Sequence, residues 1–253
     1  YHKRHRHTDV LVVGAGPSGI ASALTAARQG LQVMLVDNDV EFGGSLLASS
    51  ELIDGKPAMQ WVEQAIKELA ALDNVTLLKR TMVSGYYDQN FLVAVERVTN
   101  HLGPKTKNSD VNKDLPRERF WKIRAKRVVL ATGAIERPLA FANNDAPGIM
   151  LASGVQTYIN RYGVSAGNKA VFVTNNDSAY QSALDFHGIG GEVVAIVDTR
   201  ANANGYWQQQ ATDKGITIYH GYTIAKVHGR KGLKAVSIAK HDNGSLRNTD
   251  TKI

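Results

Sequence analysis

Apolar runs alternate with amphipathic segments along the first part of the chain. Residues 9–13 (DVLVV) form a short, β-branched run of the kind found in a strand buried on both faces. Residues 17–29 place apolar side chains at helical spacing, and Gly30 follows as a stop signal. A second apolar run, residues 31–37 (LQVMLVD), ends in an acid. This order predicts a β-α-β unit with two parallel strands.

The following segment predicts one helix and then several strands. The helix is expected over about 57–72, with Asp54 as a candidate cap and Pro57 in the first turn. Strand-like stretches follow near residues 75–79, 82–87 and 91–98. The polar residues 100–119 predict a long loop, after which residues 120–133 (FWKIRAKRVVLATG) return the chain to the sheet.

The β-α-β pattern then occurs a second time. After a break at 163–167 come an apolar run (KAVFV), a helix over about 177–187 and a strand ending in Asp198. We therefore expect an α/β protein with a dinucleotide-binding domain at 1–165, including a β insertion at about 75–127. A second, degenerate and incomplete Rossmann-like unit is expected at 166–253.

The two ends of the chain indicate an internal piece of a longer polypeptide. Tyr1 is not an initiator methionine, and the first residues (YHKRHRH) read as a polar linker. The final polar residues (HDNGSLRNTDTKI) close no predicted unit. Because His2, His5 and His7 lie in the charged linker without a carboxylate cluster, no metal site is expected.

Composition excludes several classes of protein. The chain has no cysteine, which rules out a disulfide framework, a Cys-ligated iron–sulfur cluster and a redox-active dithiol. Its apolar runs are far shorter than the roughly 20 residues that cross a bilayer, and the N-terminus lacks the apolar region of a secretory signal. We expect no membrane segment and a cytoplasmic location.

The basic balance favours an anionic partner of some kind. Thirty Lys and Arg residues against 23 Asp and Glu give a net charge of +7. A recognised nucleic-acid-binding motif is missing, so the charge is expected to serve a nucleotide or an acidic partner protein, and no nucleic acid.

The first β-α turn carries the pattern of a dinucleotide site. Gly14 permits the tight turn, Gly16 lets backbone N–H groups approach a pyrophosphate, and Gly19 lets the helix pack closely on the strand. The helix N-terminus then offers free N–H groups to an anion. Asp37 ends the second strand, where a carboxylate can accept the ribose hydroxyls. Asn38 and Asp39 follow Asp37 without an arginine, so a 2′-phosphate would meet negative charge and NADP is disfavoured.

Two more segments narrow the fold. Residues 41–45 (EFGGS) follow the acid, and residues 128–133 (VVLATG) form a buried strand that ends in small residues. With the glycine turn and the acid in this order, the chain resembles the superfamily of two-dinucleotide-domain flavoproteins. That resemblance implies an FAD/NAD(P)-binding Rossmann-like fold, a parallel sheet with added antiparallel strands, and backbone contacts to adenine from the strand near Val83.

The second turn departs from that superfamily. Residues 174–179 (TNNDSA) contain no glycine, so each Cβ crowds a pyrophosphate and Asp177 repels it. The cysteine pair of the disulfide reductases is replaced by serine, leucine and alanine at 45–49. The usual route of hydride from a nicotinamide nucleotide to a flavin therefore looks closed.

Three segments carry a closer resemblance, residues 36–47, 128–164 and 171–186. They are similar to the alpha subunits of heterotetrameric sarcosine oxidases, in their nucleotide-binding middle region. The resemblance implies an amine oxidase that converts sarcosine to glycine and H2O2, with methylene-tetrahydrofolate or formaldehyde. It also implies FAD and FMN in the complex, smaller gamma and delta subunits beside a flavin-binding beta subunit, and an alpha subunit that holds NAD without turnover.

No catalytic residue is expected in this region, and the isolated piece is expected to be inactive. The residues expected to bind the cofactor are Gly14, Gly16, Pro17, Ser18, Gly19, Asp37, Asn38, Gly43, Gly44, Ser45, Val83, Thr132 and Gly133. Two alternatives stay open. One is the alpha subunit of a dye-linked proline or opine dehydrogenase, with FAD or an adenine nucleotide at the same site, and the other is a non-catalytic nucleotide-binding scaffold.

Overall fold

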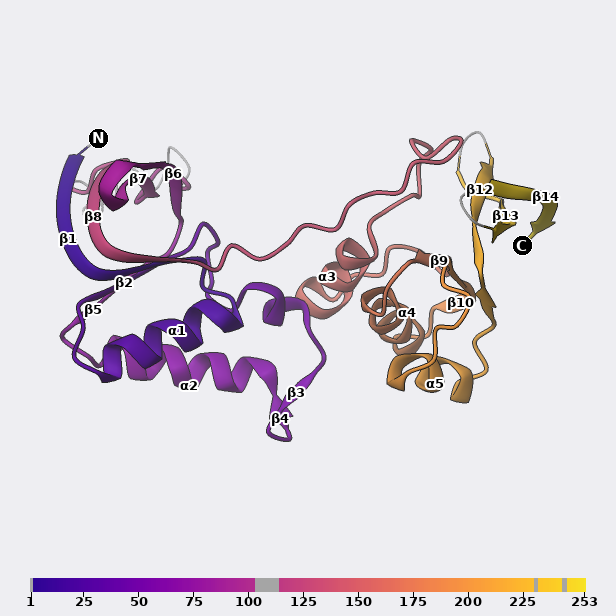
Figure 1. Ribbon diagram of the computed structural model, residues 1–253, viewed down its shortest axis with the longest axis horizontal. Coiled ribbons are helices and arrows are strands. Elements are labelled where there is room, and N and C mark those ends of the chain that lie inside the picture. The colour runs from indigo at the N-terminus through magenta and orange to yellow at the C-terminus, as the bar shows by residue number, and fades with distance from the viewer. Residues whose placement is uncertain (1, 103–113, 230–231, 243–244) are drawn as a thin grey trace. The chain divides into compact units, whose positions relative to one another are not determined.

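The chain folds into two compact units. The computed structural model describes residues 2–102, 114–229, 232–242 and 245–253, and the units are Tyr1–Ala134 and Ile135–Ile253 (Figure 1). Helix α3 (Ala152–Tyr162) packs against α4 (Ser178–Gly188), so it belongs to the second unit. The sequence prediction had placed residues 135–165 in the first domain, because the break at 163–167 indicated the boundary there.

A six-stranded mixed sheet forms the centre of the first unit. Its order is β5-β2-β1-β8-β7-β6, with β5, β2, β1 and β8 parallel and β8, β7 and β6 antiparallel. The strands are β1 (His2–Val13), β2 (Val33–Val36), β5 (Val75–Leu78), β6 (Thr81–Tyr87), β7 (Phe91–Arg97) and β8 (Glu118–Leu130). The predicted parallel sheet with added antiparallel strands is confirmed.

Two helices cover one face of the parallel strands. Helices α1 (Pro17–Arg28) and α2 (Ala58–Ala70) lie side by side (Figure 1). Ile20 of α1 and Leu69 of α2 are fully buried with Leu35 of the sheet. Burial of such side chains stabilises the unit by roughly 1.5–3 kcal/mol each.

Three local predictions in this unit were wrong. Residues 2–8 are not a linker but the first half of β1, paired in parallel with β8 from His2↔Arg119 onward. Asp54 does not cap α2, because it lies at φ +51 between β3 (Leu52–Ile53) and β4 (Lys56–Pro57). Pro57 occupies the N-cap position, without a side-chain hydrogen bond. The predicted loop 100–119 falls largely outside the described residues.

The second unit repeats the β-α-β pattern with a smaller sheet. Parallel strands run in the order β11 (Ile218–His220), β10 (Glu192–Asp198) and β9 (Lys169–Thr174). Helix α5 (Tyr206–Asp213) follows β10 and was not predicted. An antiparallel sheet joins β12 (Tyr222–His228), β13 (Ala235–Asp242) and β14 (Ser245–Lys252). Residues 241–242 and 245–252 of the polar final stretch therefore lie in strands, although the sequence prediction saw no completed unit at this end.

The lengths and composition of the helices bear on membrane insertion. Throughout the described ranges, every helix is too short or too polar to cross a lipid bilayer.

Candidate functional site

The glycine turn after β1 is built by very close backbone approaches. Gly14 has φ +98, and a Cβ added there would overlap the carbonyl oxygen of Ala131. A Cβ on Gly19 would overlap the carbonyl of Gly14. The turn, the start of α1 and the end of β8 are therefore held together without intervening side chains, as the sequence predicted for Gly14 and Gly19.

Gly16 and Gly44 face one another across the opening of this turn. A Cβ on Gly44, which has φ +56, would lie 2.7 Å from the Gly16 Cα, whereas a Cβ on Gly16 would meet nothing closer than 3.9 Å. Gly43 donates its N–H to the Ala15 carbonyl at 2.8 Å, which fixes the second loop against the first. The short 3-10 helix η1 (Gly44–Ala48) continues from there.

Helix α1 begins at this opening with its N-terminal end uncovered. Pro17 is the first helical residue, and Gly16 at the N-cap makes no side-chain capping bond. Ser18 is exposed in the first turn, and Ser45 is exposed in η1. The positive end of the helix dipole and the N–H groups of the first turn are therefore available to an anion.

Asp37 lies beside the opening, immediately after β2. Its carboxylate accepts the Ala15 N–H at 2.5 Å and the Asp39 N–H at 2.7 Å. These two bonds fix its orientation, and the remaining lone pairs of a partly exposed carboxylate can accept hydroxyl donors. The Asp37 carbonyl accepts the Thr81 N–H at 2.7 Å, which places the start of β6, and with it the strand of Val83, beside the acid.

An arginine distant in sequence lies next to this acid. Arg97 of β7 donates from Nη2 to the Asn38 carbonyl at 3.1 Å. Sequence reasoning considered only the residues that follow Asp37 and missed this contact, which depends on the antiparallel strands folding back toward β2.

The ATG segment completes the site. Ala131 donates its N–H to the Val13 carbonyl at 2.8 Å, and Thr132 and Gly133 follow as exposed residues. A Cβ on Gly14 would also crowd the Thr132 Cα, at 3.2 Å. The turn at residues 14–16, Gly44 and Asp37 thus lie around one opening, called the cradle below, which a side chain on Gly44 would close. A cradle of bare backbone, an open helix end and an oriented carboxylate fit the pyrophosphate and ribose of a dinucleotide.

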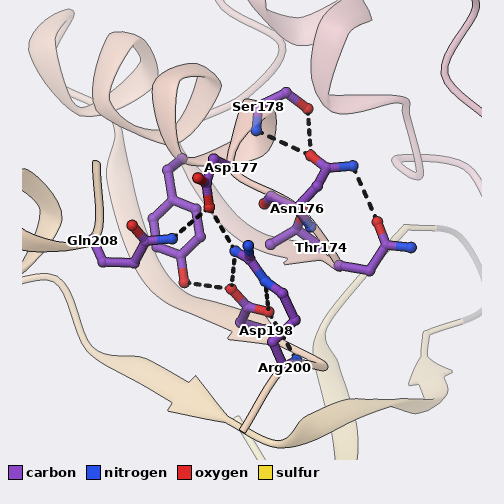
Figure 2. A network of polar contacts seen from close by, with 9 residues as sticks. Thr174, Asn176, Asp177, Ser178, Asp198, Arg200 and Gln208 are labelled. Atoms are coloured by element: carbon purple, nitrogen blue, oxygen red, sulfur yellow. Dashed lines mark hydrogen bonds and ion pairs between the residues drawn. The ribbon is translucent and has the colours of Figure 1, made fainter. Parts of the chain in front are cut away.

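The equivalent turn in the second unit is filled by an ionic network (Figure 2). Asp177 stands at the N-cap of α4, where it accepts bonds from Arg200 Nη2 at 2.7 Å and from Gln208 Nε2 at 2.6 Å. The same Arg200 Nη2 lies 2.7 Å from Asp198 Oδ2. One guanidinium therefore links two carboxylates, one in the turn before α4 and one at the end of β10.

Asp198 is the buried centre of this network. It is 0 % exposed and accepts bonds from the Tyr180 hydroxyl at 2.8 Å and from the Arg200 N–H and Nε at 2.9 and 3.0 Å. Burial raises the pKa of this carboxyl, but the bonds from Arg200 and Tyr180 outweigh burial and hold the pKa below its usual value. Burial and the bond to Asp198 raise the pKa of Tyr180.

Polar groups at the start of α4 also form hydrogen bonds with neighbouring residues of the same turn. Asn176 Oδ1 accepts the Ser178 N–H at 3.0 Å and the Ser178 hydroxyl at 2.7 Å, and Thr174 Oγ1 donates to the Asn176 carbonyl at 2.8 Å. With a carboxylate at the helix end and the Ser178 N–H engaged, this turn does not fit a pyrophosphate. Sequence reasoning identified Asp177 as repulsive but missed Arg200, whose signal is its place two residues after the acid.

The network predicts that the second unit loses stability in acid. A carboxyl whose pKa is lowered by folding contributes stability above its unfolded pKa and loses it as the pH falls through the lower folded value. For Asp198 and Asp177 that loss begins below their ordinary value of 3.8. Urea midpoints followed by Trp207 fluorescence, in a Trp61→Phe/Trp121→Phe background, should fall below this pH. A fall equally steep in Asp198→Asn would assign the acid sensitivity to other groups.

The chain is similar to known proteins over nearly its whole length. Residues 8–253 match the family described as "Pyridine nucleotide-disulphide oxidoreductase". The sarcosine oxidase alpha subunit of Corynebacterium sp. strain U-96 is 48% identical over 246 residues, which are 96% of this chain and 25% of that relative. An opine oxidase subunit of Agrobacterium tumefaciens strain Ach5 is 26% identical over 198 residues, covering 76% of this chain and 37% of the relative.

Among solved structures, the thioredoxin reductase of Lactococcus lactis superimposes with a TM-score of 0.67 at 18% identity. The match covers 97% of this chain and 74% of the reductase, and it shows the fold alone. The chain spans about a quarter of the length of the sarcosine oxidase alpha subunit that it matches. The resemblance to these alpha subunits seen in the sequence is confirmed.

The family match extends over nearly the whole chain, and the fold agrees with it. Because the chain contains no cysteine, the disulphide chemistry of the family name cannot take place on its own side chains. With its glycine cradle, its two β-α-β units and its mixed sheet, the chain belongs to the pyridine nucleotide-disulphide oxidoreductase family.

Proposed function

We propose that the chain is the NAD-binding region of the alpha subunit of a sarcosine-oxidase-type enzyme. The observation that carries the proposal is the contrast between the two units. The first has an open backbone cradle beside Asp37, and the second has its turn filled by Asp177 and Arg200. One dinucleotide is therefore held per chain, and in the described part of the chain the second β-α turn offers no site for another that could exchange hydride with it.

The chain's own residues bind and orient the cofactor. NAD supplies a hydride acceptor when it is bound, yet nothing in this arrangement makes use of that chemistry. The backbone around Gly16 and Gly44 and the start of α1 hold the pyrophosphate, and Asp37 accepts the ribose hydroxyls. Oxidation of the amine is assigned to FAD and FMN in the complex. The partners in that complex are a flavin-binding beta subunit and smaller gamma and delta subunits.

NAD is preferred to NADP on electrostatic grounds. A 2′-phosphate would lie near the carboxylates of Asp37 and Asp39, and the Arg97 guanidinium beside Asn38 would offset only part of the repulsion. The phosphate and these carboxylates carry like charges and repel each other, whereas the ribose hydroxyls of NAD donate hydrogen bonds to Asp37.

The test is to denature the purified protein and identify the released nucleotide by absorbance and mass. NAD without a yellow chromophore, at one molecule per chain, is the expected result. Release of FAD would show that the first unit is a flavin site and would overturn the NAD proposal. Release of NADP would contradict the argument from Asp37 and Asp39.

Gly16→Ala should weaken dinucleotide binding and leave the fold intact. A Cβ at this position meets nothing within 3.9 Å in the folded chain, and the backbone has φ −76, which alanine readily adopts. The methyl group would instead occupy the approach to the pyrophosphate, so we expect a loss of about 2 kcal/mol, roughly a 30-fold rise in Kd. Calorimetry with NAD measures the affinity, and thermal unfolding without NAD is the control. Unchanged affinity would remove Gly16 from the site.

The alternative is a subunit of the opine oxidase type, which the lower similarity to the opine oxidase relative supports less well. Reconstitution with the partner subunits separates the two. Peroxide formed with sarcosine supports the proposal, and activity confined to opines or proline supports the alternative. Inactivity with every amine in an assembled complex that contains its flavins would favour a nucleotide-binding scaffold.

A further inference from the structure

One edge of the first unit's sheet is open along half of a strand. β1 pairs with β8 over almost its whole length, from His2 to Val13, but β2 pairs with it only at residues 10–13 (Figure 1). Within the described part of the chain, residues 2–8 therefore have a strand neighbour on one side only. Alternate residues of such an edge direct unpaired backbone N–H and C=O groups outward, ready to pair with another strand.

This open edge is strongly basic. Its residues 2–7 (HKRHRH) are all exposed, and Lys3, Arg4 and Arg6 have no ion-pair partner among the described residues. The nearby acids are already engaged, since Asp9 pairs with Lys126 at 2.8 Å and Glu96 pairs with Arg119 at 3.0 Å. The positive charge of the edge is thus uncompensated.

A hollow lies where the open edge meets the start of β2. Its volume is about 320 Å³. The residues that line it are His7, Thr8, Asp9, Gln32, Arg124, Ala125 and Lys126. A strand laid along residues 2–8 would reach this hollow and could place a side chain in it.

We propose that the open edge of β1 binds an extended, acidic segment of a partner chain, which adds to the sheet as a further strand. Strand addition satisfies the unpaired backbone groups, and charge complementarity selects the partner. Side chains alternate along a strand, so Arg4 and Arg6 lie on one face of the sheet and Lys3 on the other. An acidic segment therefore meets a cation on both faces.

The charge of the open edge also distinguishes between the possible binding partners. A second copy of this chain would bring the same basic strand against itself, and like charges on facing strands are destabilising. A small anion would neutralise the charge but would leave the backbone groups of the edge unpaired. An acidic peptide strand would neutralise the charge and also pair with the backbone groups of the edge. This proposal does not depend on which nucleotide the first unit holds.

The test uses a ten-residue labelled peptide of alternating glutamate and valine, titrated with the protein and followed by fluorescence anisotropy at low salt. Saturable binding that weakens as salt is added is expected. A peptide of the same sequence and charge, N-methylated at alternate residues, cannot form the backbone ladder and should bind at least tenfold more weakly. Equal binding of the two peptides would overturn strand addition and leave only charge attraction.

Matched variants locate the binding surface. Lys3→Glu/Arg4→Glu/Arg6→Glu should weaken binding of the unmodified peptide at least tenfold. The control Lys56→Glu/Lys67→Glu/Lys214→Glu changes net charge equally at exposed positions elsewhere and should leave binding within twofold. Equal losses in both variants, or no saturable binding at any salt concentration, would refute the proposal. Tighter binding of a single-stranded oligonucleotide of equal charge would replace it with a nucleic-acid surface.

Discussion

Gly14→Ala is expected to lower the free energy of unfolding of the first unit by about 4 kcal/mol, through strain of about 1–3 kcal/mol and overpacking of similar size. The strain arises because φ at Gly14 is +98, a value that a residue with a Cβ rarely adopts. The overpacking arises because that Cβ would overlap the Ala131 carbonyl, which is itself held in the sheet by the bond from the Ala131 N–H to Val13. Neither Gly14 nor Ala131 can move apart from the other without breaking the pairing of β1 and β8.

Gly30→Ala is the matched control for that substitution. Gly30 has φ +77 but nothing within 4 Å of an added Cβ, so alanine there brings strain without overlap, at about 1 kcal/mol. Hydrogen exchange of peptides that cover β1 and β8, read by mass spectrometry, measures the loss in the first unit. Equal effects of the two variants would show that the contact with Ala131 contributes nothing.

Asp198→Ala is expected to destabilise the second unit by about 3 kcal/mol. Removing one partner of a buried ion pair costs about 3–5 kcal/mol, and the lower end applies because the Arg200 side chain is 35% exposed and keeps Asp177. The Tyr180 hydroxyl, on a fully buried side chain, loses its acceptor at the same time. Urea unfolding followed by Trp207 fluorescence, in the background lacking Trp61 and Trp121, measures the loss.

Glu68→Ala serves as the control for the ionic network. Glu68 also bonds an arginine in a two-point arrangement, with distances of 2.6 and 2.7 Å to Arg28, but both side chains are well exposed. Solvent screens such a pair, so its removal should leave the unfolding midpoint of the first unit unchanged within error. Equal losses in Glu68→Ala and Asp198→Ala would show that burial does not distinguish the two networks.

The sequence predicted those elements whose signals are local. The apolar runs that became β2 and β10, the helical spacing that became α1 and the glycine turn before that helix all agree with the structure. The fold class could be predicted because strand, glycines, helix and acid follow in a fixed order. The residues of the cradle could be predicted because bare backbone at a helix start requires glycine.

The remaining features depend on partners distant in the chain. Residues 2–8 look like a linker because charged residues are uncommon in strands. They form a strand only because they pair with residues 119–125. Arg97 reaches Asn38 across 59 positions, and Gln208 reaches Asp177 across 31, separations that no local pattern indicates. Helix α3 was missed because only Ile159 of its side chains is buried, which leaves a weak apolar stripe.

The long strand β8 has a consequence for the order in which the first unit folds. β1, α1 and β2 are neighbours in sequence and can associate early, but Val13 also pairs with Leu130, far along the chain. Contacts of such sequence separation form late, because the intervening chain must first be ordered. Since Gly14 rests on Ala131, the turn that we propose receives the pyrophosphate is incomplete until that last strand is in place. Nucleotide binding is therefore a marker of the finished first unit, and not of its early β-α-β part.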